Sequence, residues 1–146
     1  MESARRPRVL FLCTGNSCRS QIAEGWARSL FGDRIEAYSA GIETHGLNPR
    51  AVLVMREAGV DISGQRSQHV DEFGDLAPDL VITVCDSAAE QCPLLPGARR
   101  VVHHSFQDPA RATGDDEQVL PVFRRVRDEI RAFVARLPEL LEEEIR

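Results

Sequence analysis

Residues 8–20 read RVLFLCTGNSCRS, an apolar run followed by a cluster of turn-forming residues. The run from Arg8 to Cys13 predicts a buried strand, because it is short and made almost entirely of β-compatible apolar residues. The polar residues after it predict a tight loop. From Ser17 to about Gly32, apolar residues recur at helical spacing, at Ile22, Ala23, Trp26, Ala27 and Leu30. The sequence therefore predicts a strand, a short loop and a helix in direct succession.

The same alternation of strands and helices continues along the chain. Further strands are predicted at residues 35–40, 80–85 and 99–104, and further helices at 48–59 and from about Gln118 until Pro138 kinks or ends the last one. Strands that alternate with helices through short loops predict one doubly wound α/β domain over residues 1–146. We expect a three-layer α/β/α sandwich with a four-stranded parallel, flavodoxin-like sheet.

Composition excludes several classes of function. The formal charge of −5 argues against broad nucleic-acid binding, which needs a basic face. All 18 basic residues are arginines, which excludes a Walker-type or Schiff-base lysine. Because no apolar run suits a membrane span or a signal peptide, we expect a cytoplasmic protein without membrane or nucleic-acid partners. In that compartment, four cysteines indicate catalysis, redox chemistry or metal binding rather than structural disulfides.

The loop after the first strand has the features of an anion site. It lies where doubly wound sheets bind ligands, and its backbone N–H groups and the helix dipole suit a tetrahedral oxyanion. Arg19 offers a planar fork for two oxygens. The same positive potential favours the thiolate of Cys13, which Ser20 is placed to stabilise by donating a hydrogen bond. The predicted binding residues are Thr14, Gly15, Asn16, Ser17, Cys18, Arg19 and Ser20.

These residues resemble the low-molecular-weight protein tyrosine phosphatase superfamily, whose signature is Cys-x5-Arg-Ser/Thr in this strand, loop and helix setting. The resemblance continues through residues 39–41, 48–49 and 59–63, so it covers most of the chain. It implies the low-molecular-weight phosphatase fold and a catalytic Cys13 assisted by Arg19. It also implies that Asp108, held extended by the proline after it, is the general acid that protonates the leaving oxygen.

Two further cysteines distinguish a reductase from a phosphatase. Cys85 ends the third predicted strand, where it is expected to approach Cys13, and Cys92 follows seven positions later. This pattern resembles the thioredoxin-coupled arsenate reductases. The resemblance implies that Cys13 attacks arsenate, Cys85 attacks the adduct and releases arsenite, and Cys92 then forms a Cys85–Cys92 disulfide that thioredoxin reduces. Two electrons reduce As(V) to As(III), which is what one dithiol supplies when it becomes a disulfide.

Three other interpretations stay open besides a monomeric arsenate reductase. A low-molecular-weight phosphatase would use Cys13, Arg19 and Asp108 alone, although it commonly has an aromatic residue where Ala110 follows the Asp-Pro pair. A non-enzymatic thiol redox sensor or a zinc-binding module would keep only the cysteines. Zinc is disfavoured because structural zinc sites usually pair cysteines two to four residues apart. Cys18 is expected to line the site without a catalytic role, and an unproductive disulfide with Cys13 is conceivable.

Cofactor residues are few in this sequence. We expect no tightly bound cofactor and no metal site, and the four histidines show no spacing that requires a metal; they are His45, His69, His103 and His104. Some arsenate reductases of the resembled class bind potassium near the loop, and Asn16, Glu24 and Ser39 match residues associated with it. Gln68 stands where a carboxylate would be expected, which weakens this predicted potassium site.

Overall fold

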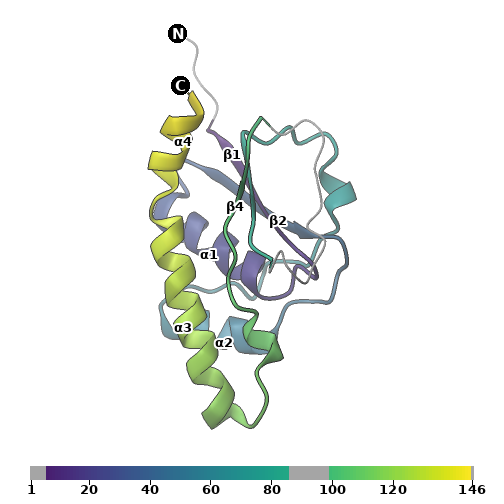
Figure 1. Ribbon diagram of the computed structural model, residues 1–146, viewed down its shortest axis with the longest axis vertical. Coiled ribbons are helices and arrows are strands. Elements are labelled where there is room, and N and C mark those ends of the chain that lie inside the picture. Colours follow the sequence, from purple (N-terminus) through teal and green to yellow (C-terminus); the bar gives the residue numbers. More distant parts are fainter. Residues whose placement is uncertain (1–5, 86–98, 146) are drawn as a thin grey trace.

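Four parallel strands form one sheet in the order β2-β1-β3-β4 in a computed structural model that describes residues 6–85 and 99–145 (Figure 1). The strands are β1 (Arg8–Cys13), β2 (Glu36–Gly41), β3 (Leu80–Thr83) and β4 (Val101–His103). The predicted four-stranded parallel sheet is therefore confirmed. The bounds of three strands differ slightly from the predicted ones. Strand β2 begins one residue later than expected, and β3 and β4 are shorter than expected.

Strand β1 lies in the middle of the sheet and is covered on both faces. Residues 9–13 are all buried, which explains why this strand shows no alternation of polar and apolar residues. Val9 and Phe11 belong to the larger apolar cluster, whereas Leu10 and Leu12 belong to a smaller cluster on the opposite face. One strand thus contributes to two cores.

In residues 6–85 and 99–145, four α-helices and two short 3-10 helices accompany the sheet. They are α1 (Arg19–Phe31), α2 (Pro49–Glu57), η1 (Val70–Phe73), η2 (Pro109–Arg111), α3 (Asp116–Val134) and α4 (Leu137–Ile145). The side chain of Asn48 accepts hydrogen bonds from the first backbone N–H groups of α2, so the Asn48-Pro49 pair begins a helix as predicted. In the described part of the chain, no helix is both long and apolar enough to cross a membrane.

The C-terminal helical stripe is divided into two helices. Helix α3 begins at Asp116, two residues before the predicted start, with Asp115 and Gln118 forming a capping box. The break comes after Val134, and Pro138 lies in the first turn of α4, where proline is tolerated. The helix therefore breaks a few residues before the proline, and not at the proline as predicted.

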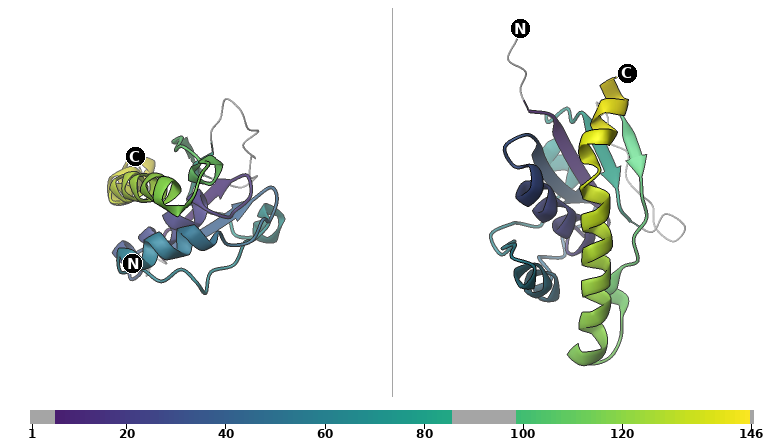
Figure 2. Two further views of the ribbon diagram at one scale, coloured as in Figure 1. Left: turned by 90° about the horizontal axis from the view of Figure 1, so that it is seen from below. Right: turned by 90° about the vertical axis from the view of Figure 1, so that its left-hand side faces the viewer.

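The two faces of the sheet are covered differently. Buried side chains of all four α-helices join the cluster of Val9 and Phe11, and Figure 2 shows α3 and α4 as one long column against that side of the strands. On the other face, among the described residues, Val70 and Phe73 of η1 cover Leu10 and Leu12. The three expected layers are present, with a thin third layer.

The register of β1 brings three strand ends to one edge of the sheet. Cys13 is level with Gly41 of β2, and Leu12 is level with Thr83 of β3. Chain segments that follow these strands therefore lie side by side. Gly41 lies so close to the segment after β1 that an added Cβ would be 2.6 Å from the carbonyl oxygen of Thr14 and 2.8 Å from the amide nitrogen of Asn16.

Substituting Gly41→Ala should lower the free energy of unfolding by about 1–3 kcal/mol, because backbone atoms of the β1 loop would have to move. Urea denaturation followed by circular dichroism measures this change. Gly64→Ala is the matched control, since a Cβ there meets nothing within 4 Å. Equal stability of the two variants would contradict the close approach of these strand ends.

Candidate active site

A loop of residues 14–18 connects the end of β1 to the start of α1. Asn16 has a φ of 47°, a left-handed conformation that asparagine tolerates better than most residues. Cys18 precedes the helix, and its side chain does not cap it. The first N–H groups of α1 have no partners within the helix, and the helix dipole is positive at this end. The loop and helix start therefore suit an anion.

The segment that follows β2 fixes this loop from the side. Its backbone amides donate to loop carbonyls, from Glu43 to Thr14 at 2.9 Å and from His45 to Gly15 at 3.0 Å. The amide of Asn48, at the start of α2, donates to the carbonyl of Ser17 at 3.0 Å. Because these loop carbonyls are occupied on the outside, the loop is held in one shape before any ligand arrives.

A pocket of about 290 Å³ opens at the loop. Three parts of the chain line it: Cys13, Thr14, Gly15, Ser17, Cys18, Arg19, His45, Asp108, Ala110 and Arg111. Its volume lies at the lower end of the about 300–1,000 Å³ found for pockets that take drug-sized ligands. The pocket therefore holds a tetrahedral oxyanion with room to spare, and its volume alone does not select the substrate.

Two of the predicted binding residues lie beneath the pocket instead of lining it. Asn16 and Ser20 are fully buried, and neither is among the lining side chains. Asn16 Nδ2 donates to Ser20 Oγ at 2.8 Å, and Ser20 Oγ lies 2.9 Å from Cys13 Sγ. Both residues therefore act on the pocket through Cys13.

The hydrogen bonds around Asn16 fix the orientation of its amide and leave the Ser20 hydroxyl proton available to another partner. Asn16 Oδ1 accepts from Gln21 Nε2 at 3.0 Å and from the amide of Gln68 at 2.7 Å, so the other terminal atom of Asn16 is the donor. Ser20 Oγ accepts that bond and has one proton of its own left. This is the proton that Ser20 can donate to Cys13 Sγ when the sulfur is a thiolate.

Arg19 is buried at the inner wall of the pocket. Its residue exposure is only 4%, and Nη1 donates to the carbonyl of Phe106 at 3.2 Å. Nη2 lies 3.6 Å from Asp108 Oδ2. A guanidinium held in this way is preorganised to bind two oxygens of one anion.

Asp108 reaches the same pocket from the segment after β4. It precedes η2, the short green turn between β4 and α3 in Figure 1, and its Oδ1 accepts from the amide of Ala110 at 3.0 Å. Pro109 opens this turn and is buried. The carboxyl group therefore has a fixed position at the rim, next to Arg19, with a quarter of its side-chain surface exposed.

Cys18 differs from Cys13 although both line the pocket. Burial raises the pKa of the Cys18 thiol far above its usual range, and the negative charges of Asp108 and Cys13 act in the same direction. Arg19 opposes this shift but does not cancel it. Cys18 thus remains a protonated thiol near neutral pH, which agrees with the prediction that it lines the site.

Cys85 lies two residues beyond the end of β3 and is fully buried. The pairing of Leu12 with Thr83 brings it to the same edge of the sheet as Cys13. Cys85 is disulfide-bonded, whereas Cys13 and Cys18 carry free thiols. Cys92 lies outside the described residues.

The residues suggested for potassium do not form an open set of ligands. Ser39 Oγ donates to Glu24 Oε1 at 2.6 Å, and Arg28 Nη2 lies 2.7 Å from Glu24 Oε2. The Asn16 oxygen already accepts from Gln21 and Gln68. Burial raises the pKa of Glu24, which further weakens a carboxylate ligand. The described residues contain no group of three or more metal-binding His, Cys, Asp or Glu side chains.

Three pocket residues were missed by sequence reasoning: His45, Ala110 and Arg111. His45 packs against Gly15 so closely that a Cβ on that glycine would lie 2.4 Å from the ring. The sequence held one sign that these residues could reach the pocket: each follows a predicted parallel strand, and such strands end at the same edge of the sheet. The other three histidines do not line this pocket.

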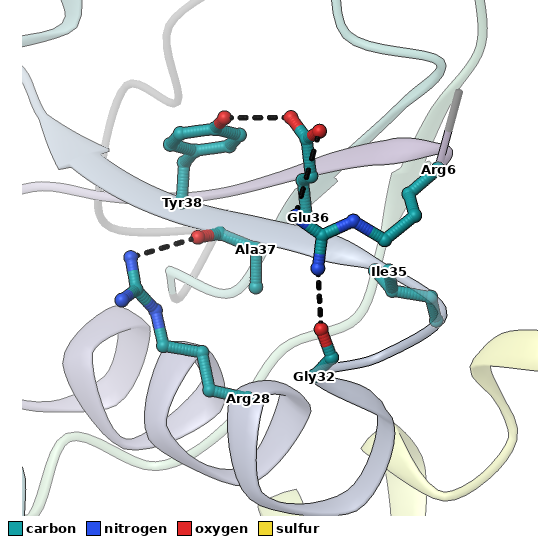
Figure 3. A pocket seen from close by; sticks show the side chains of 7 residues that line it. All are labelled: Arg6, Arg28, Gly32, Ile35, Glu36, Ala37 and Tyr38. Carbon is teal, nitrogen blue, oxygen red and sulfur yellow. Dashed lines mark hydrogen bonds and ion pairs between the residues drawn. The ribbon is translucent and has the colours of Figure 1, made fainter.

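Another pocket, of about 350 Å³, lies where β2 begins and is shown in Figure 3. Its polar groups bond to one another: the Tyr38 hydroxyl donates to Glu36 Oε1 at 2.8 Å, and Arg28 donates to the carbonyl of Ala37 at 3.1 Å. No cysteine, serine or histidine lines it. Although larger, it lacks a nucleophile, so the pocket at Cys13 is the candidate active site.

Comparison with known proteins identifies the family. The model of the family described as low molecular weight phosphotyrosine protein phosphatase matches residues 8–146. An arsenate reductase from Halalkalibacterium halodurans is 55% identical over 122 residues, which cover 84% of this chain and 88% of that relative.

Solved structures agree with this relationship. An arsenate reductase in its phosphate binding state superposes with a TM-score of 0.76 at 35% identity, covering 94% of this chain and 98% of that one. A thioredoxin-dependent arsenate reductase from Corynebacterium glutamicum gives a TM-score of 0.72 at 25% identity, covering 97% of this chain and 64% of that one. The chain therefore belongs to the low molecular weight phosphotyrosine protein phosphatase family, on its arsenate reductase branch.

Proposed function

We propose that this protein reduces arsenate to arsenite with Cys13, Cys85 and Cys92 as the reacting groups. One observation carries the proposal: Cys13 lines the pocket beside Arg19 with its Sγ 2.9 Å from Ser20 Oγ, while a second cysteine follows the neighbouring strand. The arsenate reductases among its relatives support the same chemistry.

The first step joins sulfur to arsenic. Arsenate binds with its oxygens toward the backbone N–H groups of residues 14–18 and the guanidinium of Arg19. The Cys13 thiolate attacks the arsenic atom and forms an S–As bond. One oxygen leaves as water after it takes a proton from Asp108, the general acid at the rim. Arg19 and the loop stabilise the negative charge on the remaining oxygens.

The next two steps move electrons between sulfur atoms. Once the disulfide that Cys85 forms in the structure has been reduced, the Cys85 thiolate attacks Cys13 Sγ, and the electron pair of the S–As bond goes to arsenic, which leaves as arsenite. A disulfide between Cys13 and Cys85 remains. Cys92 then attacks Cys85, releases the Cys13 thiolate and leaves a Cys85–Cys92 disulfide. One dithiol has been oxidised for each As(V) reduced to As(III).

Hydrolysis of aryl phosphates is the weaker alternative. A phosphatase would use Cys13, Arg19 and Asp108 but would have no need of the cysteine after β3. Ala110 lines the pocket where phosphatases of this fold commonly present an aromatic residue to the substrate ring. An inorganic anion needs no such stacking partner.

Regeneration of the enzyme requires an external dithiol. Thioredoxin fits this need, since its reduction potential of about −270 mV is low enough to reduce an accessible protein disulfide. The relative from C. glutamicum is thioredoxin-dependent. We propose that the protein acts in the cytoplasm, where thiols are kept reduced, as a monomer whose single domain spans residues 1–146.

Replacing the third cysteine separates the steps. Cys92→Ser should release about one arsenite per chain and then stop, because the Cys13–Cys85 disulfide can form but cannot be resolved. Cys85→Ser should release none. Arsenite formation in a single turnover, and NADPH oxidation with thioredoxin and thioredoxin reductase, measure the two effects, with thermal unfolding as the check that each variant is folded.

Turnover of Cys92→Ser at the wild-type rate would eliminate the relay. If wild type oxidises no NADPH with arsenate but hydrolyses p-nitrophenyl phosphate rapidly, the phosphatase alternative is correct.

Activity should not depend on potassium. Arg28 already supplies a positive charge beside Glu24, and Ser39 occupies the other carboxylate oxygen. Exchanging potassium for sodium at constant ionic strength should therefore leave KM for arsenate and the melting temperature unchanged. A potassium-specific rise in melting temperature would reveal a bound ion and contradict this expectation.

A further inference from the structure

The charges that line the active-site pocket do not balance a doubly charged oxyanion. In the proposed mechanism Cys13 reacts as a thiolate, which is negative, Asp108 is a neutral proton donor, and Arg19 is positive. The loop amides and the helix N-terminus add only about half a positive charge. A bound tetrahedral dianion therefore leaves the site with an excess of negative charge unless another cation contributes.

The guanidinium of Arg19 already has partners on the protein. Its Nη2 lies 3.6 Å from Asp108 Oδ2, and its Nη1 donates to the carbonyl of Phe106. His45 offers little more, since its Nε2 is 2.5 Å from Glu43 Oε1, so that a carboxylate accompanies any charge on the ring. A second cation has to come from elsewhere on the rim.

Arg111 is the remaining cationic side chain that lines the pocket. Its guanidinium has no ion pair or side-chain hydrogen bond to any of the residues in 6–85 and 99–145. Its backbone is well fixed, because the Arg111 amide donates to the carbonyl of Asp108 at 3.2 Å and the Ala112 amide donates to that of Pro109 at 3.1 Å. The turn that positions Asp108 thus also places beside it a charge that has no partner among the described residues.

We propose that Arg111 is a specificity-determining residue that makes the pocket select doubly charged over singly charged tetrahedral oxyanions. Its positive charge offsets the second negative charge of the ligand, which Arg19 alone leaves uncompensated. Ala110, the small residue before it, leaves the guanidinium open access to the pocket mouth. In a chain of net charge −5, one local cation also helps to draw the anion in from solution. The inference rests on the proposed function only for the identity of the substrate.

Binding of inorganic phosphate to the reduced protein, followed by calorimetry, tests the inference without any redox turnover. Arg111→Gln should weaken phosphate binding about three- to fivefold at low ionic strength, as expected for a partly exposed charge pair. Arg111→Lys, which keeps the charge, should stay within about twofold of wild type. Arg56→Gln is the matched control, because Arg56 is an exposed arginine on α2 that does not line the pocket.

Charge selectivity supplies the readout that a purely structural role would not change. Perchlorate, a singly charged tetrahedral anion, should lose less affinity than phosphate in Arg111→Gln. The difference between wild type and Arg111→Gln should shrink as salt screens the exposed guanidinium. In steady-state assays, KM for arsenate should rise while kcat changes little, since Arg111 binds the anion without entering the chemistry.

Three results would overturn the inference. Phosphate binding by Arg111→Gln equal to that of wild type shows that the charge does not reach the ligand. An equal loss in Arg111→Lys shows that charge is not the reason. An equal loss for perchlorate shows that the pocket itself has changed. Because phosphate binding needs neither Cys85 nor Cys92, failure of the arsenate reductase proposal would leave this test intact.

Discussion

Strand β1 pairs with β2 on one side and with β3 on the other, and this double pairing brings Cys13 and Cys85 to one edge of the sheet. The register places Cys13 level with Gly41 and Leu12 level with Thr83. The segment after β2 can therefore hold the carbonyls of the β1 loop, and Cys85 arrives at the same edge of the sheet. A slip of one residue in either pairing would turn these side chains to the opposite face.

Hydrogen bonds between buried groups beneath the loop also determine the surroundings of the nucleophile. Gln21 and the amide of Gln68 both donate to the oxygen of Asn16, so that its amide group can present only its N–H to Ser20. The Ser20 hydroxyl proton is then available to Cys13 Sγ, 2.9 Å away. The groups beneath the nucleophile are neutral and buried, which spares the pocket the desolvation of another charged side chain.

Local and distant residues differed in how far the sequence predicts them. Cys13 and Arg19 belong to one continuous strand, loop and helix, so their spacing in the sequence alone predicts an oxyanion site. The alternation of strands with helices along the chain likewise predicts the parallel sheet. Arg111 and Arg28 are different, because their roles depend on which distant side chains lie beside them. The pairing of Arg28 with Glu24 is local in the helix, yet only the position of Ser39 on β2 shows that the carboxylate is fully used.

The proposed relay requires a third cysteine because the first two are buried. Cys13 is 2% exposed and Cys85 is fully buried. Exchange with an external dithiol needs direct access of the attacking sulfur to the disulfide. Thioredoxin therefore has no path to a disulfide between these two sulfurs while they stay inside. Burial of both sulfurs would keep the oxidised product inside the fold, unless a further thiol of the same chain carries the oxidation outward. Cys92 has this task in the proposed mechanism, so the same burial that supports the first step makes the last one necessary.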